Sequence, residues 1–175
     1  MTAAHFFLRP ETADAHDVVD RAFSRFDLAR AEDYRAFLIA HARVLAPLEP
    51  HLATASQLPS WRPRMPLLAS DLARLNATIP APTTIEGLGH GAELLGALYV
   101  IEGSRLGGGL LARRVGQGLP RDYLSAVHLP GEWRTLLATL DAAASTASAR
   151  EAMVIGARYV FELYANAAKA AETAV

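Results

Sequence analysis

The stretch LLGALYVIEGSRLGGGLLARR (94–114) starts as an apolar helix and then places four glycines within seven residues. These glycines are Gly103, Gly107, Gly108 and Gly109. A glycine inside a helix costs about 1 kcal/mol relative to alanine, so the cluster weakens the helix considerably. Two uses of a bare backbone could offset that cost: tight packing of another helix, or the close approach of a flat ligand. Four glycines are more than one helix crossing normally needs, which favours the ligand.

The composition predicts one soluble domain over residues 1–175. Of these 175 residues, 51% are hydrophobic and 20% are charged, with a formal net charge of −1. This balance gives no reason to expect nucleic acid or an anionic membrane as a partner. The absence of cysteine excludes disulfides and thiolate metal ligands. With no signal-peptide core and no apolar run of about 18 residues, a cytoplasmic location is expected.

Helical periodicity dominates the first half of the chain. Four residues spaced by three or four form one apolar stripe: His16, Val19, Phe23 and Phe26. Pro10 suits the first turn of that helix. A second helix is expected over about 31–46, with Pro47 and Pro50 disturbing or ending it. A shorter helix is expected over about 66–77, after a proline-rich loop.

The second half of the chain shows the same pattern. The sequence Thr83-Thr84-Ile85-Glu86 matches a capping box, which predicts that a long helix begins near residue 84 and runs through the glycine cluster. Another helix is expected over about 132–145. A second capping box, Ser148-Ala149-Arg150-Glu151, predicts a final helix that ends near residue 171. The fold class is therefore all-α, a multi-helical bundle of about six to eight helices.

Few residues are arranged for familiar catalytic chemistry. The sequence has no nucleotide-binding loop, no H-E-x-x-H and no paired Glu-x-x-His. Six histidines remain as possible ligands. His16 and His41 both lie on apolar helical stripes, where a histidine is most often a satisfied core residue. Periodicity does not distinguish between the two.

The histidines and glycines together suggest one arrangement of a ligand. A histidine on one side and a glycine-lined helix on the other would hold a haem with an open face for dioxygen. Tight helix packing remains the alternative use of the glycines.

Three stretches of the chain resemble the haem oxygenase family, and its bacterial members most closely. LRPETADAHDVVD (8–20) resembles the opening helix of the family, with its proximal histidine. YVIEGSRLGGGLLARR (99–114) resembles the distal helix, whose glycines flex above the haem. ARYVFELYANAA (157–168) resembles the last helix more weakly. The resemblance implies a single haem oxygenase-like domain.

The resemblance also implies roles for individual residues. His16 would be the proximal iron ligand, and Arg9 would pair with a haem propionate. Arg134 would be a second propionate partner, and Phe161 a pocket aromatic. On the distal side, the implied residues are Gly103, Ser104, Gly107 and Gly108. Ser104 stands where the animal enzymes carry an aspartate that anchors their proton-donating water network.

The reaction implied by the resemblance is the oxidative cleavage of haem to biliverdin, carbon monoxide and ferrous iron. Haem would be both cofactor and substrate, dioxygen the oxidant, and an external reductase or ferredoxin the source of electrons. The product could pass to a bacteriophytochrome. The main alternative is a non-catalytic haem carrier or sensor of the same fold, which Ser104 favours. The residues also leave open a thiaminase-related bundle and an interaction protein without a ligand.

Overall fold

The computed structural model describes the backbone of residues 3–172 and the side chains of residues 7–171. Within this part the chain is helical and contains no strand, which confirms the all-α prediction. The eight helices are α1 (Ala3–Glu11), α2 (Ala13–Phe23), α3 (Ala31–Ala53), α4 (Met65–Arg74), α5 (Ala92–Ala112), α6 (Asp122–Ser125), α7 (Glu132–Ala143) and α8 (Ala147–Glu172).

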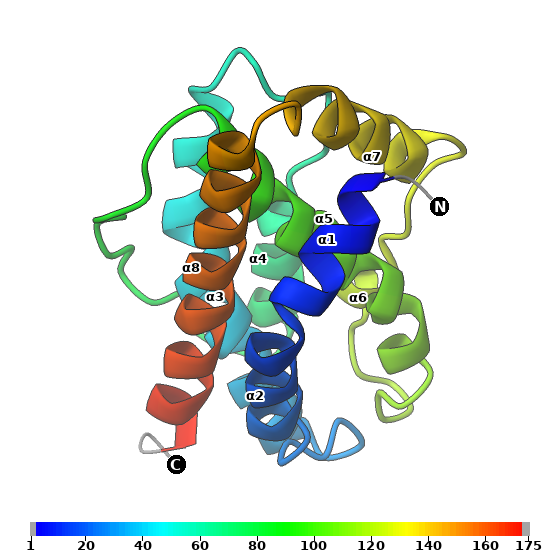
Figure 1. Ribbon diagram of the computed structural model, residues 1–175. Helices are drawn as coiled ribbons and strands as arrows, with labels where there is room; N and C mark the ends of the chain where they lie inside the picture. Colours follow the sequence, from blue (N-terminus) through cyan, green and yellow to red (C-terminus); the bar gives the residue numbers. More distant parts are fainter. Residues whose placement is uncertain (1–2, 173–175) are drawn as a thin grey trace.

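The long helices α3, α5 and α8 form the centre of the bundle (Figure 1). Helix α8 packs against α5, α3 and α2, and α1 packs against α7 and α8. Figure 1 shows α1 and α2 in front of α5, with α7 across one end. The apolar faces of the helices meet in a core dominated by leucine, alanine and aromatic side chains.

Two glycines allow α5 and α8 to cross closely. A Cβ added to Gly96 would collide with the carbonyl oxygen of Met153, and one added to Gly156 would collide with that of Glu93. The backbones are therefore in direct contact at this crossing, and no larger residue fits. This contact holds the N-terminal half of α5 in place. The glycine cluster lies further along the same helix.

The prolines of α3 do not end it, contrary to the sequence prediction. The helix continues through Pro47 and Pro50 to Ala53. A proline inside a helix costs about 3 kcal/mol, because it lacks an N–H and clashes with the preceding turn. Leu48 and Leu52 lie beyond Pro47 and are completely buried. Burying each of them contributes about 1.5–3 kcal/mol, which offsets much of the cost of the two prolines.

The predicted start of the glycine-rich helix near residue 84 is also wrong. Residues 77–90 contain no helix, and α5 begins at Ala92. Gly87 and Gly91 have φ values of +84° and +61°, which interrupt a right-handed helix. The side chain of Glu93 accepts a hydrogen bond from the Gly89 N–H at 2.7 Å, so the cap is formed here and not at Glu86.

The remaining helix ends differ by smaller amounts. Pro10 lies near the end of α1 rather than in its first turn, and α2 follows after Thr12. The final helix starts at Ala147, where the Thr146 hydroxyl accepts a hydrogen bond from the Ala149 N–H at 3.1 Å. A threonine two residues before Ser148 therefore provides the cap.

Candidate active site

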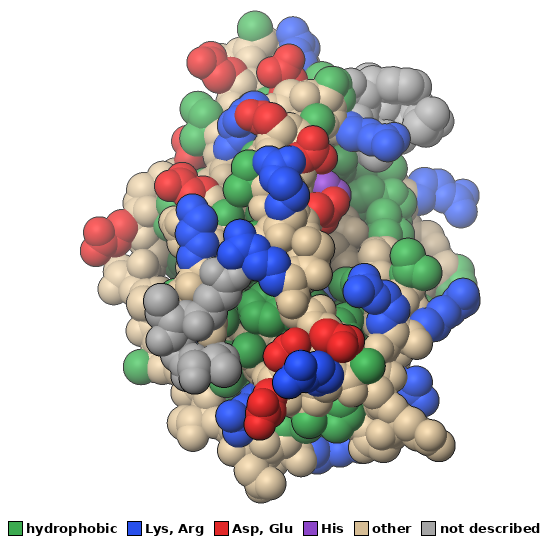
Figure 2. Space-filling model, turned by 90° about the horizontal axis from the view of Figure 1, so that it is seen from below, with side chains coloured by type: hydrophobic (Ala, Val, Ile, Leu, Met, Phe, Trp, Pro, Cys, Tyr) green, Lys and Arg blue, Asp and Glu red, His purple; other side chains and the backbone are tan. Residues whose placement is uncertain are grey.

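A cavity of about 520 Å³ separates α2 from the C-terminal half of α5. Its walls also include side chains from α1, α3, α7 and α8. A hollow is visible on the face shown in Figure 2, with apolar side chains and a histidine at its wall. The lining contains six of the residues that the sequence singled out: Arg9, His16, Gly103, Ser104, Gly107 and Phe161.

His16 forms the proximal-side wall on α2. Its Nδ1 lies 3.1 Å from Oδ2 of Asp20, one helical turn later. The ring makes an edge contact with Phe161 of α8, with centroids 5.6 Å apart. The side chain remains 58% exposed, although the residue lies on the apolar stripe of its helix. With Nδ1 held by a carboxylate, Nε2 is the nitrogen left to bind a ligand.

The glycines of α5 divide into two groups. A Cβ on Gly107 would meet nothing within 4 Å, and one on Gly103 would meet only the Trp133 ring at 3.8 Å. A Cβ on Gly108 would lie 2.8 Å from the carbonyl oxygen of Leu124, and one on Gly109 would lie 3.5 Å from Val127. Gly103 and Gly107 thus give the cavity a flat wall. Gly108 is absent from the lining and packs against α6.

Helix α5 runs through the glycines without interruption to Ala112. The glycines therefore keep helical geometry in this structure, and the cavity wall is bare at Gly103 and Gly107.

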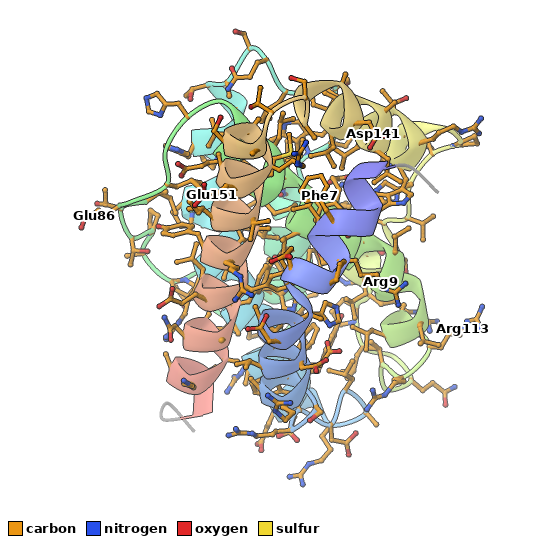
Figure 3. All side chains as sticks on the ribbon, viewed as in Figure 1. Phe7, Arg9, Glu86, Arg113, Asp141 and Glu151 are labelled. Atoms are coloured by element: carbon orange, nitrogen blue, oxygen red, sulfur yellow. The ribbon has the colours of Figure 1, made fainter. Side chains whose placement is uncertain are left out.

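Of the two arginines expected to bind propionates, Arg9 lines the cavity and Arg134 does not. Arg9 lines the cavity beside Tyr99 and Trp133, whose rings lie 5.7 Å apart. Burial raises the pKa of Tyr99, and the positive charge of Arg9 opposes that rise. In Figure 3, Arg9 extends from α1 towards the C-terminal half of α5. Arg134 is exposed on α7 and is not part of the lining.

A buried arginine that sequence reasoning missed holds Ser104. Arg64, only 2% exposed, donates from Nη2 to Ser104 Oγ at 2.6 Å and to the Ile101 carbonyl at 2.7 Å. Ser104 Oγ itself donates to the same carbonyl at 2.7 Å. The carboxylate of Glu49 accepts hydrogen bonds from the backbone N–H groups of Arg64 and Met65, at 2.7 and 3.0 Å. Arg64 comes from the proline-rich loop, where no periodicity could have indicated it.

His41 forms the inner end of the cavity. Its Nδ1 shares a hydrogen bond of 2.6 Å with the Tyr123 hydroxyl, and its ring packs against Phe23 and Phe37. Burial, aided by the charge of Arg64, lowers the pKa of His41 to about 3. The imidazole is therefore neutral throughout the physiological range.

A second buried ionic group fixes the segment behind the glycine wall. Arg105 bonds Glu102 through Nε and Nη2, at 3.2 and 3.0 Å, and donates to the carbonyls of Arg62 and Ala126. His128 Nε2 lies 3.0 Å from the second oxygen of Glu102. These bonds tie the turn of α5 that carries Gly103 and Ser104 to two loops. The orientation of that turn is thus set from behind the cavity.

The geometry favours a flat ligand bound between His16 and α5. Three or more histidine, aspartate or glutamate side chains do not come together as a metal site anywhere in the described residues. An accessible imidazole on α2 instead shares the cavity with two glycines of α5 that leave its wall locally bare. None of the helices between residues 3 and 172 combines the length and apolarity needed to cross a membrane.

Comparisons with known proteins agree with this geometry. No protein-family profile matches the chain. A haem oxygenase of Xanthomonas campestris pv. campestris is 33% identical over 153 residues, covering 75% of this chain and 86% of that protein. The NO- and CO-bound haem oxygenase of Neisseria meningitidis has the same fold, with a TM-score of 0.80 at 22% identity over 98% of this chain and 92% of that one. The identity and coverage of the Xanthomonas relative place the chain in a family already suggested by its cavity: it belongs to the haem oxygenases.

Proposed function

We propose that this chain cleaves haem oxidatively to biliverdin, carbon monoxide and ferrous iron, with dioxygen as oxidant. The observation that carries the proposal is the placement of an accessible His16 opposite the bare backbone of Gly103 and Gly107. A planar macrocycle fits such a space, because one face needs a ligand for the iron and the other needs open space for dioxygen.

The residues of the cavity suit haem. The inner wall is aromatic, with Phe23 and Phe37, and the wall beneath His16 contains Phe161. The space above Gly107 is open, where an alanine methyl would intrude. Bound haem supplies the redox-active iron and the ring that is opened.

His16 is proposed to hold the iron through Nε2. The Asp20 carboxylate accepts the hydrogen bond from Nδ1–H, which fixes the tautomer and the ring orientation. It also increases the basicity of the ligating nitrogen. Asp20 is therefore a positioning residue for the ligand.

On the distal side, Ser104 is proposed to act with Arg64. The Ser104 hydroxyl proton is directed to the Ile101 carbonyl, and one oxygen lone pair is used by Arg64. The second lone pair remains to accept a hydrogen bond from a small molecule in the cavity. Ser104 thus orients hydrogen-bond donors near the open glycine wall and is not itself an acid. Its role differs from that of an aspartate.

Arg9 and Tyr99 are proposed to bind the propionates. A guanidinium and a phenol in the cavity lining are suited to carboxylates. Gly108 packs against α6 and Arg134 lies outside the lining, so neither has a role in this proposal.

The electron donor is proposed to dock beside the cavity mouth. Leu106, Leu110 and Val127 are 56%, 66% and 55% exposed, although they are large apolar side chains. Arg113 and Arg121 border a shallow depression that also includes Val127. Figure 3 shows Arg113 at the outer edge of the molecule, near the end of α5. An apolar centre bordered by cations suits an acidic reductase or ferredoxin.

A donor experiment tests this surface. Arg113→Glu should reduce turnover supported by an acidic ferredoxin and leave turnover supported by ascorbate unchanged. Lys169→Glu, with the same charge change on α8, is the control. Equal loss with both reductants would show that Arg113 does not act through the protein donor. Two further expectations stay predictions: that a bacteriophytochrome accepts the biliverdin, and that the protein is located in the cytoplasm.

The alternative is a haem carrier or sensor without turnover. It is favoured by the hydrogen bonds of Ser104, because they leave no free acid at the position that animal enzymes use. The deciding experiment supplies purified protein with haem, dioxygen and a reductant. Decay of the Soret band with appearance of biliverdin absorbance supports the enzyme, and a persistent Soret band supports the carrier. His16→Ala should abolish histidine-ligated absorption, with partial recovery in added imidazole.

A further inference from the structure

The two bare positions of the α5 wall differ in what lies in front of them. A Cβ added to Gly107 would meet nothing within 4 Å, whereas one added to Gly103 would lie 3.8 Å from Cη2 of Trp133. Gly103, Gly107 and Trp133 all belong to the cavity lining. The indole edge of Trp133 therefore limits the space in front of one turn of α5, and the space in front of the next turn stays open.

Two other rings contact Trp133. Its ring centroid lies 5.7 Å from that of Tyr99 and 5.6 Å from that of His128, with interplanar angles of 31° and 37°. Tyr99 precedes Gly103 by one helical turn on α5. His128 lies in the segment that joins α6 to α7 and is not part of the cavity lining. Ring pairs at such distances attract one another beyond the burial of their area, so both contacts favour one position of the indole.

His128 is itself held from α5. Its Nε2 lies 3.0 Å from Oε2 of Glu102, and the side chains of His128 and Glu102 are 9% and 6% exposed. Its Nδ1 is buried and has no hydrogen-bond partner among the described residues. The proton of the neutral ring therefore belongs on Nε2, which donates it to the carboxylate. Burial lowers the pKa of His128, while the charge of Glu102 opposes the change, so the neutral ring is the form present at pH 7.

The first turn of α7 is fixed by a separate set of bonds. Arg62 donates from Nε and Nη2 to the two carboxylate oxygens of Glu132, at 2.7 and 2.9 Å. The same carboxylate accepts a hydrogen bond from the Leu129 N–H at 2.7 Å. Since Glu132 immediately precedes Trp133, the backbone of that turn is anchored independently of His128. Removing the His128 ring should therefore release the indole and leave the helix in place.

We propose that Trp133 is a specificity-determining residue that limits the size of ligands on the Gly103 side of the distal space, and that His128 is the positioning residue that keeps the indole there. The inference rests on the proposed function and adds a selection among the small molecules that reach bound haem. A diatomic molecule such as dioxygen fits beside the indole edge, whereas a ligand with a longer chain must turn towards Gly107. His128 acts through Trp133 and touches no reacting atom.

Ligands of graded length test the role of Trp133. Methyl, ethyl and n-butyl isocyanide are titrated spectroscopically against the ferrous haem complex, with carbon monoxide as the short reference. Trp133→Leu should raise the affinity for n-butyl isocyanide relative to carbon monoxide by about tenfold, since a single methylene in a close-fitting apolar pocket can already change selectivity by that much. The ratio for methyl isocyanide should change less. Trp61→Leu, the same substitution outside the cavity lining, is the control and should leave every ratio at the wild-type value.

Fluorescence of the apo protein tests the role of His128 without haem. The chain has two tryptophans, so in a Trp61→Phe background the emission comes from Trp133 alone. Its anisotropy and its quenching by acrylamide report on the mobility and exposure of the indole, and His128→Ala should lower the first and increase the second. His128→Phe keeps a ring beside the indole and His128→Gln keeps a donor for Glu102, so each should restore part of the wild-type behaviour. His90→Ala, at an exposed histidine, should change neither quantity.

The two measurements are then joined in the haem complex. We expect the His128 variants to shift the isocyanide ratios in the same direction as Trp133→Leu and by a smaller factor. Wild-type ratios in haem-bound Trp133→Leu would overturn the inference, as would unchanged Trp133 emission in every His128 variant. A wild-type protein that binds haem and gives the expected ratios but forms no biliverdin would overturn the proposed function alone, so the two failures are distinguishable.

Discussion

Gly107 and Gly108 are adjacent in the sequence and have different surroundings. Space is open where a Gly107 Cβ would lie, whereas a Gly108 Cβ would approach the Leu124 carbonyl to 2.8 Å. Open space that a ligand could use and close helix packing, the two uses that the sequence left open, are therefore both found within one cluster. Sequence alone does not show which glycine serves which use, because adjacent helical residues differ by about 100° in direction and the neighbouring elements are unknown.

Alanine substitutions should separate the two glycines. Gly107→Ala should raise the unfolding free energy of the apo protein by about 0.4–1 kcal/mol, through better helix propensity and lower unfolded-state entropy. Its methyl should also lower the rate of ring opening. Gly108→Ala should lower apo stability by about 1–3 kcal/mol through overpacking against a backbone atom. Denaturant midpoints and single-turnover rates measure both effects. If Gly108→Ala instead stabilised the protein, α6 would have to move away to accommodate the methyl group, which would contradict the assigned packing.

The contact between Ser104 and Arg64 is a second feature that local sequence patterns could not predict. Ser104 was predicted from the resemblance of residues 99–114 to the distal helix of the family, whereas the bond to Arg64 joins residues 40 positions apart. His16 and His41 looked equivalent on their stripes, and only tertiary structure leaves one accessible and buries the other. Long-range contacts decide both cases, and local periodicity does not contain them.

Removing the Ser104 hydroxyl should expose its role. Ser104→Ala leaves the buried Arg64 with one acceptor fewer, which should lower apo stability by about 1–3 kcal/mol. Haem affinity should change little, because His16 and Arg9 are unaltered, while turnover should fall. Chemical denaturation, haem titration and biliverdin formation provide the measurements. Unchanged turnover would remove Ser104 from the distal machinery.

At the scale of elements, helix existence was easier to predict than helix ends. The helices over 66–77, 132–145 and near 148–171 were expected, and α4, α7 and α8 occupy nearly those ranges. Periodicity and composition were sufficient there. The beginning of α5 and the end of α3 depended on left-handed glycines at 87 and 91 and on deeply buried leucines. Both features depend on tertiary surroundings.

The close crossing of α5 and α8 can be tested by adding a methyl group at Gly96. Gly96→Ala places a methyl against the Met153 carbonyl, and the backbones must separate to accept it. We expect a loss of about 1–3 kcal/mol in unfolding free energy, or failure to fold. Gly109→Ala is the matched control on the same helix, because its Cβ would lie at an ordinary 3.5 Å from Val127. Equal denaturant midpoints for the two variants would contradict the assigned contact.

At the scale of the whole molecule, the cavity exists because the helices around it are anchored elsewhere. The α5–α8 crossing and the Glu102–Arg105 pair hold α5, and Arg158 of α8 bonds Asp14 of α2 at 2.8 Å. The space between α2 and α5 is kept open by contacts at its edges. The buried polar groups at its inner end then link the stability of the entire fold to pH.

His41 provides the test of that link. Its pKa is about 3 in the folded protein against an ordinary value of 6.5, so between these limits the unfolded chain binds a proton that the native protein does not. Stability contributed by neutral His41 is therefore complete above pH 6.5 and falls as the pH decreases towards 3, by up to about 1.4 kcal/mol per pH unit. His41→Phe removes this dependence but takes the imidazole partner from the buried Tyr123 hydroxyl, at a cost of about 1–3 kcal/mol near neutral pH. Other buried acids, such as Glu49 and Asp71, are present in both proteins and cancel in the comparison. Unfolding free energies measured from pH 7 to pH 4 should consequently converge, because the wild type loses stability faster than the variant. Parallel curves would mean that His41 takes up its proton at the same pH in the folded protein as in the unfolded chain, which would contradict the burial of a neutral imidazole at the inner end of the cavity.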